Sequence, residues 1–78
     1  MTSRKGIIVW VWEDDRLMWQ PYDPHVSNFI EQKRYVSQTL LGLQPADTKM
    51  KHYCIDFQNM KQIRTGTGTL SFQCVTRN

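Results

Sequence analysis

The sequence predicts a single α+β domain in which a curled antiparallel sheet of about six short strands packs around one helix. Three observations indicate this fold: a tryptophan-rich strand pair near the N-terminus, one amphipathic helical stretch after it, and several short strand-like runs separated by turns. Because one helix cannot cover both faces of a parallel sheet, the strands are expected to be antiparallel, with the sheet curled around the helix. The 78 residues are too few for more than one domain.

The stretch Ile7–Tyr22 contains all three tryptophans of the chain. Its first half, Ile7–Trp12, is a run of β-branched, aliphatic and indole side chains, which predicts a strand. Alternation places Ile8, Trp10 and Trp12 on one face of this strand. We expect each tryptophan to lie in the core, and the alternative is that one indole lines a pocket.

A hairpin is expected to follow this strand. The polar run Glu13–Arg16 has the length of a hairpin loop. The segment Leu17–Gln20 then resumes the strand until Pro21, which has no N–H to donate to a neighbouring strand.

A helix is expected over Pro24–Tyr35. Asp23 is a favoured N-cap residue whose side chain can accept hydrogen bonds from free backbone amides, and proline is favoured at the first helical position. Apolar residues at helical spacing form one stripe toward the core: Val26, Phe29 and Ile30. The positions expected to face water are Ser27, Asn28, Glu31 and Gln32.

The rest of the chain predicts short strands separated by turns. The runs are 36–43, 49–57, 60–64 and 69–76. In the second run, alternation places Tyr53 and Ile55 on one face and His52 and Cys54 on the other. The segment Thr65–Gly68 is expected to be a hairpin loop.

Charge and hydropathy narrow the class of protein. The chain carries ten basic and seven acidic residues, a formal charge of +3 and a pI near 9.1. This balance favours an anionic partner, but the basic residues are too scattered along the chain for a sequence-specific nucleic-acid module. Since no apolar run reaches membrane-spanning length and no signal peptide is evident, we expect a soluble protein without a membrane partner. We also expect the domain to be a monomer. Its expected location is intracellular, in the cytoplasm, the nucleus or both.

Neither catalysis nor a bound cofactor is expected. Neither histidine has a neighbouring serine or cysteine arranged as nucleophile and base, and the Thr65–Thr69 glycine loop lacks the lysine of a phosphate-binding loop. His52, Cys54 and Cys74 are only three candidate zinc ligands without the usual spacing. We therefore expect no metal and two reduced thiols.

Ligand binding is better represented than catalysis. Trp12 and Tyr53 offer flat aromatic surfaces for a base or ribose, and Gln62 offers an amide. Lys61 and Arg64 lie close to these residues in the chain and could meet phosphate. The open end of a curled sheet is a natural concave site. The alternative is that these strands carry an ordinary solvated basic face.

The residues resemble the WWE domain, a family named for its tryptophans and glutamate. The motifs are Trp10-x-Trp12-Glu13, Trp19-x-x-Tyr22, a single helix, and Asp56-Phe57-x-x-Met60-x-Gln62. The likeness covers about residues 6–76. It implies a half-barrel sheet around one helix, no catalysis, and recognition of ADP-ribose units, notably the iso-ADP-ribose linkage inside poly(ADP-ribose).

Position by position, the resemblance assigns ligand contacts to Trp12, Tyr53 and Gln62. The residues matching scaffold positions are Trp10, Glu13, Trp19 and Tyr22. The chain departs from the pattern at two site positions. Gln20 stands where poly(ADP-ribose) readers have an aromatic residue, and Ser71 stands where they have an arginine that meets phosphate. The expected ligands are therefore iso-ADP-ribose and poly(ADP-ribose), or terminal ADP-ribose and ATP-like nucleotides.

Within the family, the sequence is most similar to Deltex-type ubiquitin ligases. The similarity rests on Pro21-Tyr22-x-Pro24-x-Val26-Ser27, on Glu31, and on the Thr67-Gly68-Thr69 turn. Deltex proteins use paired WWE modules to hold the ankyrin repeats of Notch. The resemblance therefore also implies a rival function, a protein-interaction module that binds an ankyrin-repeat protein.

Overall fold

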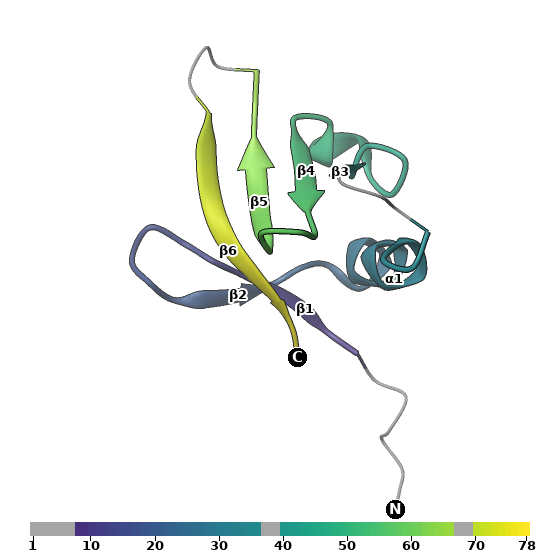
Figure 1. Cartoon of the computed structure of the whole chain (residues 1–78), viewed down its shortest axis with the longest axis horizontal. Coiled ribbons are helices and arrows are strands. Elements are labelled where there is room, and N and C mark those ends of the chain that lie inside the picture. Colours follow the sequence, from purple (N-terminus) through teal and green to yellow (C-terminus); the bar gives the residue numbers. More distant parts are fainter. Residues whose placement is uncertain (1–7, 37–39, 67–69) are drawn as a thin grey trace, which may run out of the picture.

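The computed structural model describes residues 8–36, 40–66 and 70–78. In this part of the chain it contains six strands, one α-helix and one 3-10 turn (Figure 1). The elements are β1 (Trp10–Glu13), β2 (Trp19–Pro21), α1 (Pro24–Lys33), β3 (Leu40–Gly42), η1 (Thr48–Met50), β4 (Tyr53–Asp56), β5 (Lys61–Arg64) and β6 (Ser71–Arg77).

The strands form one open antiparallel sheet in the order β2-β1-β6-β5-β4-β3. The C-terminal strand β6 lies between β1 and β5 and so joins the N-terminal hairpin to the rest of the sheet (Figure 1). The single helix packs on one side only, which we call the inner face. The predicted α+β fold, with a curled antiparallel sheet around one helix, is confirmed. No helix in the described ranges combines the length and apolarity that crossing a membrane requires.

The core lies between α1 and the inner face. Its buried residues come from the helix and from five of the six strands or their ends: Trp10, Tyr22, Val26, Ile30, Leu41, Leu43, Ile55 and Val75. Trp10 is fully buried and meets the ring of Phe57 edge-on, with 5.8 Å between ring centroids. Its indole N–H donates to the Glu31 carboxylate at 2.9 Å, so its polar atom is paired as well.

The three tryptophans have different environments. Trp10 is core, as predicted, whereas Trp12 is half-buried. The core prediction is wrong for Trp19, which is 47% exposed. Trp19 pairs with Glu13 in the β1–β2 register, one residue out of phase with Trp12, and therefore lies on the outer face. In the described residues, no second layer of structure covers that face.

The helix begins where predicted, but Asp23 before it and Ser27 within it have roles that were not expected. Pro24 opens α1, yet the Asp23 side chain makes no capping hydrogen bond. Ser27 was predicted to face water but is 3% exposed, and its hydroxyl accepts a hydrogen bond from the backbone N–H of Trp10 at 2.9 Å. Phe29, predicted to lie in the core with Val26 and Ile30, is only partly buried against it. α1 ends at Lys33, earlier than the predicted Tyr35.

Several strands are shorter than predicted. β1 begins at Trp10, and β2 begins only at Trp19 because Leu17 adopts a positive φ of 63° in the loop. β4 is confined to Tyr53–Asp56, since the Asp47 side chain accepts from the Lys49 N–H and starts the 3-10 turn η1. Of the predicted runs and loops, positions 7, 37–39 and 67–69 lie outside the described residues.

Glu31 also ties the helix to the sheet. Arg77, in β6, donates from Nε and from a terminal nitrogen to the two carboxylate oxygens of Glu31, each at 2.9 Å. Glu31 was predicted to face water. The hydrogen bonds from Arg77, with that from Trp10, hold the pKa of Glu31 below its usual range.

Acid is therefore expected to weaken the fold through Glu31. Its folded pKa is depressed, so its stabilisation is present above the unfolded value of about 4.3 and is lost as pH falls through the folded value. Replacing Glu31 with Gln should lower the free energy of unfolding at neutral pH. Below about pH 4.3, the free energy of unfolding of this variant should fall less steeply with pH than that of wild type. Urea unfolding followed across this range measures both effects. Glu13→Gln, at the other glutamate of the chain, is the matched control. If both variants have the same acid profile, the Glu31–Arg77 pair does not stabilise the fold.

Candidate functional site

A cavity of about 530 Å³ opens on the inner face of the sheet. Its walls come from the β1–β2 hairpin, the start of α1, η1, and strands β4, β5 and β6. Five of the residues predicted to bind a ligand line it together: Trp12, Tyr53, Gln62, Arg64 and Ser71. The strands are adjacent in the sheet, so residues far apart in sequence meet at one concave surface.

The other two predicted ligand contacts, Lys61 and Gln20, are not brought to the cavity. Lys61 precedes the inward-facing Gln62 in β5, so it points to the outer face, where its Nζ lies 3.1 Å from the Cys74 sulfur. Gln20 donates from its side-chain amide to the Asp14 carboxylate at 2.9 Å. Asp14 does line the cavity, so Gln20 supports the wall rather than forming it.

Gln62 lies in the middle of a chain of polar side chains. The Tyr22 hydroxyl donates to Gln62 Oε1 at 2.7 Å, and Gln62 Nε2 donates to Gln73 Oε1 at 3.1 Å. Gln62 is only 2% exposed. Burial raises the pKa of Tyr22, so its hydroxyl stays protonated and remains a donor. The amide of Gln62 is therefore held in one orientation.

Gln73, the last member of this hydrogen-bonded series, was not predicted from the sequence as a site residue. It lies directly opposite Gln62 in the β5–β6 register and lines the cavity. The strand alternation of 69–76 was visible, but only the pairing of β6 with β5 shows that Gln73 faces the same side as Gln62. Gln73 adds an amide to the polar floor of the cavity.

Arg64 and Lys49 bring positive charge to one side of the cavity. The Arg64 guanidinium lies 5.8 Å from the centre of the Tyr53 ring, within range of a cation–π contact. Arg64 also pairs with Ser71 across β5 and β6, so the serine that replaces the family's arginine has a guanidinium beside it on the next strand. This side of the cavity suits phosphate.

Three carboxylates lie on other parts of the cavity wall, and sequence reasoning missed them as site residues. Asp14 and Asp15 come from the β1–β2 hairpin, and Asp23 comes from the start of α1. In the sequence they read as loop and capping residues, and nothing in their local pattern indicates a cavity. The cavity thus has two carboxylates on the hairpin wall and a third near Asp47, at the cap of the turn that carries Lys49.

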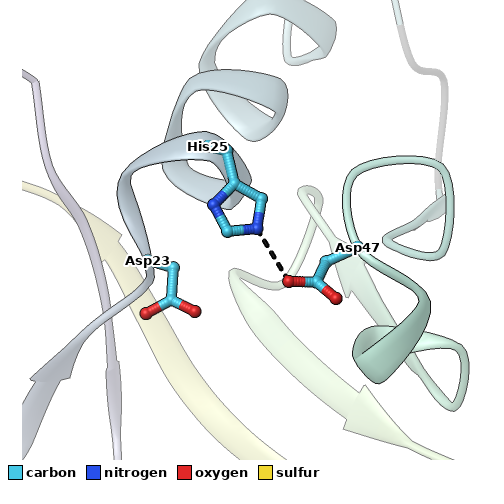
Figure 2. Close-up of side chains that lie close together, drawn as sticks. All are labelled: Asp23, His25 and Asp47. Atoms are coloured by element: carbon cyan, nitrogen blue, oxygen red, sulfur yellow. Dashed lines mark hydrogen bonds and ion pairs between the residues drawn. The ribbon is translucent and has the colours of Figure 1, made fainter.

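Asp23 also belongs to a group that could hold a metal ion, together with His25 and Asp47 (Figure 2). Their ligand atoms lie within 4.8 Å of one another. Figure 2 shows the His25 ring directed at Asp47, and His25 Nε2 lies 2.7 Å from Asp47 Oδ2. The hydrogen bond from His25, followed by that from the Lys49 N–H, lowers the pKa of Asp47. His25 and Asp47 thus already pair with each other and join α1 to the segment that carries Lys49.

The zinc ligands considered from the sequence do not converge in the same way. Cys54 is in β4 and Cys74 is in β6, with β5 between them. Two sheet spacings amount to about 10 Å, more than a disulfide spans, and both cysteines are free. Burial raises the pKa of the Cys54 thiol, with a smaller contribution from Asp56.

The chemistry of the cavity is that of binding. Over the described residues, its lining has one aliphatic hydroxyl, that of Ser71, and no histidine that could activate it. Three aromatic side chains, two amides and two cations instead match the requirements of a ligand with a flat ring and a negative charge.

Comparisons with known proteins agree with this fold and motif pattern. The model of the WWE domain family matches residues 8–72. Over 75 residues, or 90% of this chain, it is 36% identical to mouse E3 ubiquitin-protein ligase DTX4. It is also 34% identical over 65 residues to DTX1 of Xenopus laevis and 32% identical to human DTX1, with 82% of this chain covered in each. The chain spans about a tenth of the length of these relatives: 12%, 10% and 10%. Because the family model matches most of its length, tryptophan motifs included, the chain belongs to the WWE domain family.

Proposed function

We propose that this domain is a non-catalytic module that binds ADP-ribose-type ligands within an intracellular ubiquitin-ligase protein. The observation that carries the proposal is the convergence of Trp12, Tyr53 and Arg64 on one cavity of the inner face. The ubiquitin-ligase context is supported by the Deltex-type relatives.

The cavity fits such a ligand by size and by chemistry. Its volume of about 530 Å³ is within the range of small-molecule sites. A base stacked on Tyr53 or Trp12 gains roughly 1–3 kcal/mol, and phosphates can meet Arg64 and Lys49. The amide of Gln73 can pair with the polar edge of the base or the ribose, with Gln62 holding it from behind.

Isothermal titration with ADP-ribose, iso-ADP-ribose and ATP tests the proposal. We expect binding of at least one ligand that weakens as salt rises, because exposed charges on Arg64 and Lys49 contribute. ¹H–¹⁵N spectra should show the indole N–H of Trp12 and the side-chain amides of Gln62 and Gln73 shifting together. Absence of binding by all three ligands at millimolar concentration would refute the proposal.

A second candidate function, binding to a protein, has a separate observation in its favour. Three consecutive apolar residues of the β1–β2 hairpin are exposed: Leu17 by 73%, Met18 by 56% and Trp19 by 47%. Exposed apolar patches often mark protein interaction sites. The resemblance to Deltex proteins makes an ankyrin-repeat protein the partner to test. Binding that Trp19→Ala weakens and Tyr53→Ala leaves unchanged would favour this second function.

A further inference from the structure

The two carboxylates of the β1–β2 hairpin and the Arg64 guanidinium lie on different parts of the cavity wall. Asp14 and Asp15 lie on the hairpin that joins β1 to β2, whereas Arg64 is in β5 and Lys49 is in η1. Strand β6 separates β1 from β5, so the hairpin side and the Arg64 side are two sheet spacings, or roughly 10 Å, apart. The third carboxylate of the lining, Asp23, lies near Asp47 at the cap of η1, so the wall at Arg64 is the part that suits phosphate and the hairpin wall is the part that does not.

Asp14 is held firmly on the acidic side. Its Oδ1 accepts from the backbone N–H groups of Arg16 and Met18 at 2.9 and 3.0 Å, and its Oδ2 accepts from Gln20 Nε2 at 2.9 Å. These hydrogen bonds lower the pKa of Asp14, and the one from the Met18 N–H has the largest effect. The carboxylate is therefore charged at neutral pH. The Arg16 guanidinium is 3.9 Å away and its side chain is 83% exposed, so it screens this charge only weakly.

We propose that Asp14, positioned by Gln20, makes the site selective for nucleotides whose phosphates form a single cluster. A carboxylate accepts hydrogen bonds from ribose hydroxyls but repels a second phosphate. ADP-ribose, ADP and ATP carry adjacent phosphates that can all lie near Arg64 and Lys49. In iso-ADP-ribose, two phosphates are separated by two linked riboses, so one of them is directed toward the acidic side.

This inference rests on the proposed function, and it gives Gln20 a role. Gln20 does not line the cavity and offers no stacking surface, unlike the aromatic residue that poly(ADP-ribose) readers have at this position. It donates instead to the Oδ2 atom of Asp14, the oxygen that the backbone does not hold. Gln20 is thus a positioning residue, and its replacement should change the affinity for iso-ADP-ribose more than the affinity for ADP.

The test compares ADP and iso-ADP-ribose by isothermal titration against wild type, Asp14→Asn, Gln20→Ala and a control. Asparagine keeps the Oδ1 acceptor that closes the hairpin and removes the charge, but it replaces the Oδ2 acceptor of the Gln20 amide with an N–H₂ group. The Gln20→Ala variant measures the loss of that one hydrogen bond separately. Asp56→Asn is the matched control, because Asp56 likewise accepts from backbone N–H groups of its own turn, those of Gln58 and Asn59. Asp56 does not line the cavity, and its replacement changes the net charge by the same amount.

Wild type is expected to bind ADP more tightly than iso-ADP-ribose. Asp14→Asn should strengthen iso-ADP-ribose binding on the order of fivefold, the factor for one unit charge at about 4 Å in water-like surroundings, and change ADP binding less than twofold. Gln20→Ala should shift the affinity ratio in the same direction by less, and Asp56→Asn should leave the ratio unchanged. If ligands bind but Asp14→Asn strengthens both equally or neither, the inference is overturned while the proposed function stands. If neither ligand binds wild type, the inference is overturned, and the proposed function falls with it only if ADP-ribose and ATP also fail to bind.

Discussion

Trp10→Ala is expected to unfold most of the domain at room temperature. Trp10 is fully buried, contacts the Phe57 ring, and donates its indole N–H to Glu31. Truncating such a residue costs about 3–5 kcal/mol, and a core of this size rarely supplies more than about 3–5 kcal/mol in total. Urea unfolding followed by far-ultraviolet circular dichroism measures the change in the free energy of unfolding.

Trp19→Ala is the matched control for this experiment, because it removes the same side chain from the exposed outer face. We expect its free energy of unfolding to stay within about 1 kcal/mol of wild type. A Trp10→Ala variant that unfolds cooperatively with nearly wild-type stability would show that the indole is not a main element of the core.

Tyr53→Ala should cause the largest loss of ligand affinity among the cavity variants. Its ring is a stacking surface on the cavity wall and also lies 5.8 Å from the Arg64 guanidinium. Truncation removes the stack, worth roughly 1–3 kcal/mol, and releases Arg64 from its place beside the phosphate side of the cavity. We expect ADP-ribose affinity to fall at least about fivefold, and up to about a hundredfold, by isothermal titration.

Tyr35→Ala controls for the loss of a tyrosine as such. Tyr35 follows α1, is 74% exposed and does not line the cavity. Its replacement should leave ADP-ribose affinity unchanged. Equal affinities for wild type and Tyr53→Ala would instead place any bound ligand away from this wall, and would turn attention to the exposed hairpin residues Leu17, Met18 and Trp19.

Elements with strong local signals were predicted well. Proline at the first helical position and apolar residues at helical spacing located α1 correctly at its start. A run of β-branched and indole side chains located β1, alternation located β4, and turn signals on either side located β5 and β6. The ends of these elements were less predictable, because they depend on side-chain contacts such as the Asp47 side chain that starts η1 before β4.

The cavity shows where local pattern stops being informative. Trp12, Tyr53, Gln62, Arg64 and Ser71 were named from the sequence and meet at one surface. Lys61 was named as well, but it is adjacent to Gln62 in a strand and so faces the opposite side. Gln73 was missed because its position depends on how two strands pair.

The sequence by itself determined the six strands and the single α-helix, the place of Trp10 in the core and the family of the domain, because all of these depend on short-range patterns of residue type. Only the tertiary structure decided that Trp19 faces outward, that Ser27 and Glu31 pair with Trp10, and that Asp14 faces the same cavity as Arg64. The physical reason is strand register: a shift of one residue moves every side chain of a strand to the other face. Register in this sheet is set by contacts between strands that are distant in the chain, above all by β6 lying between β1 and β5.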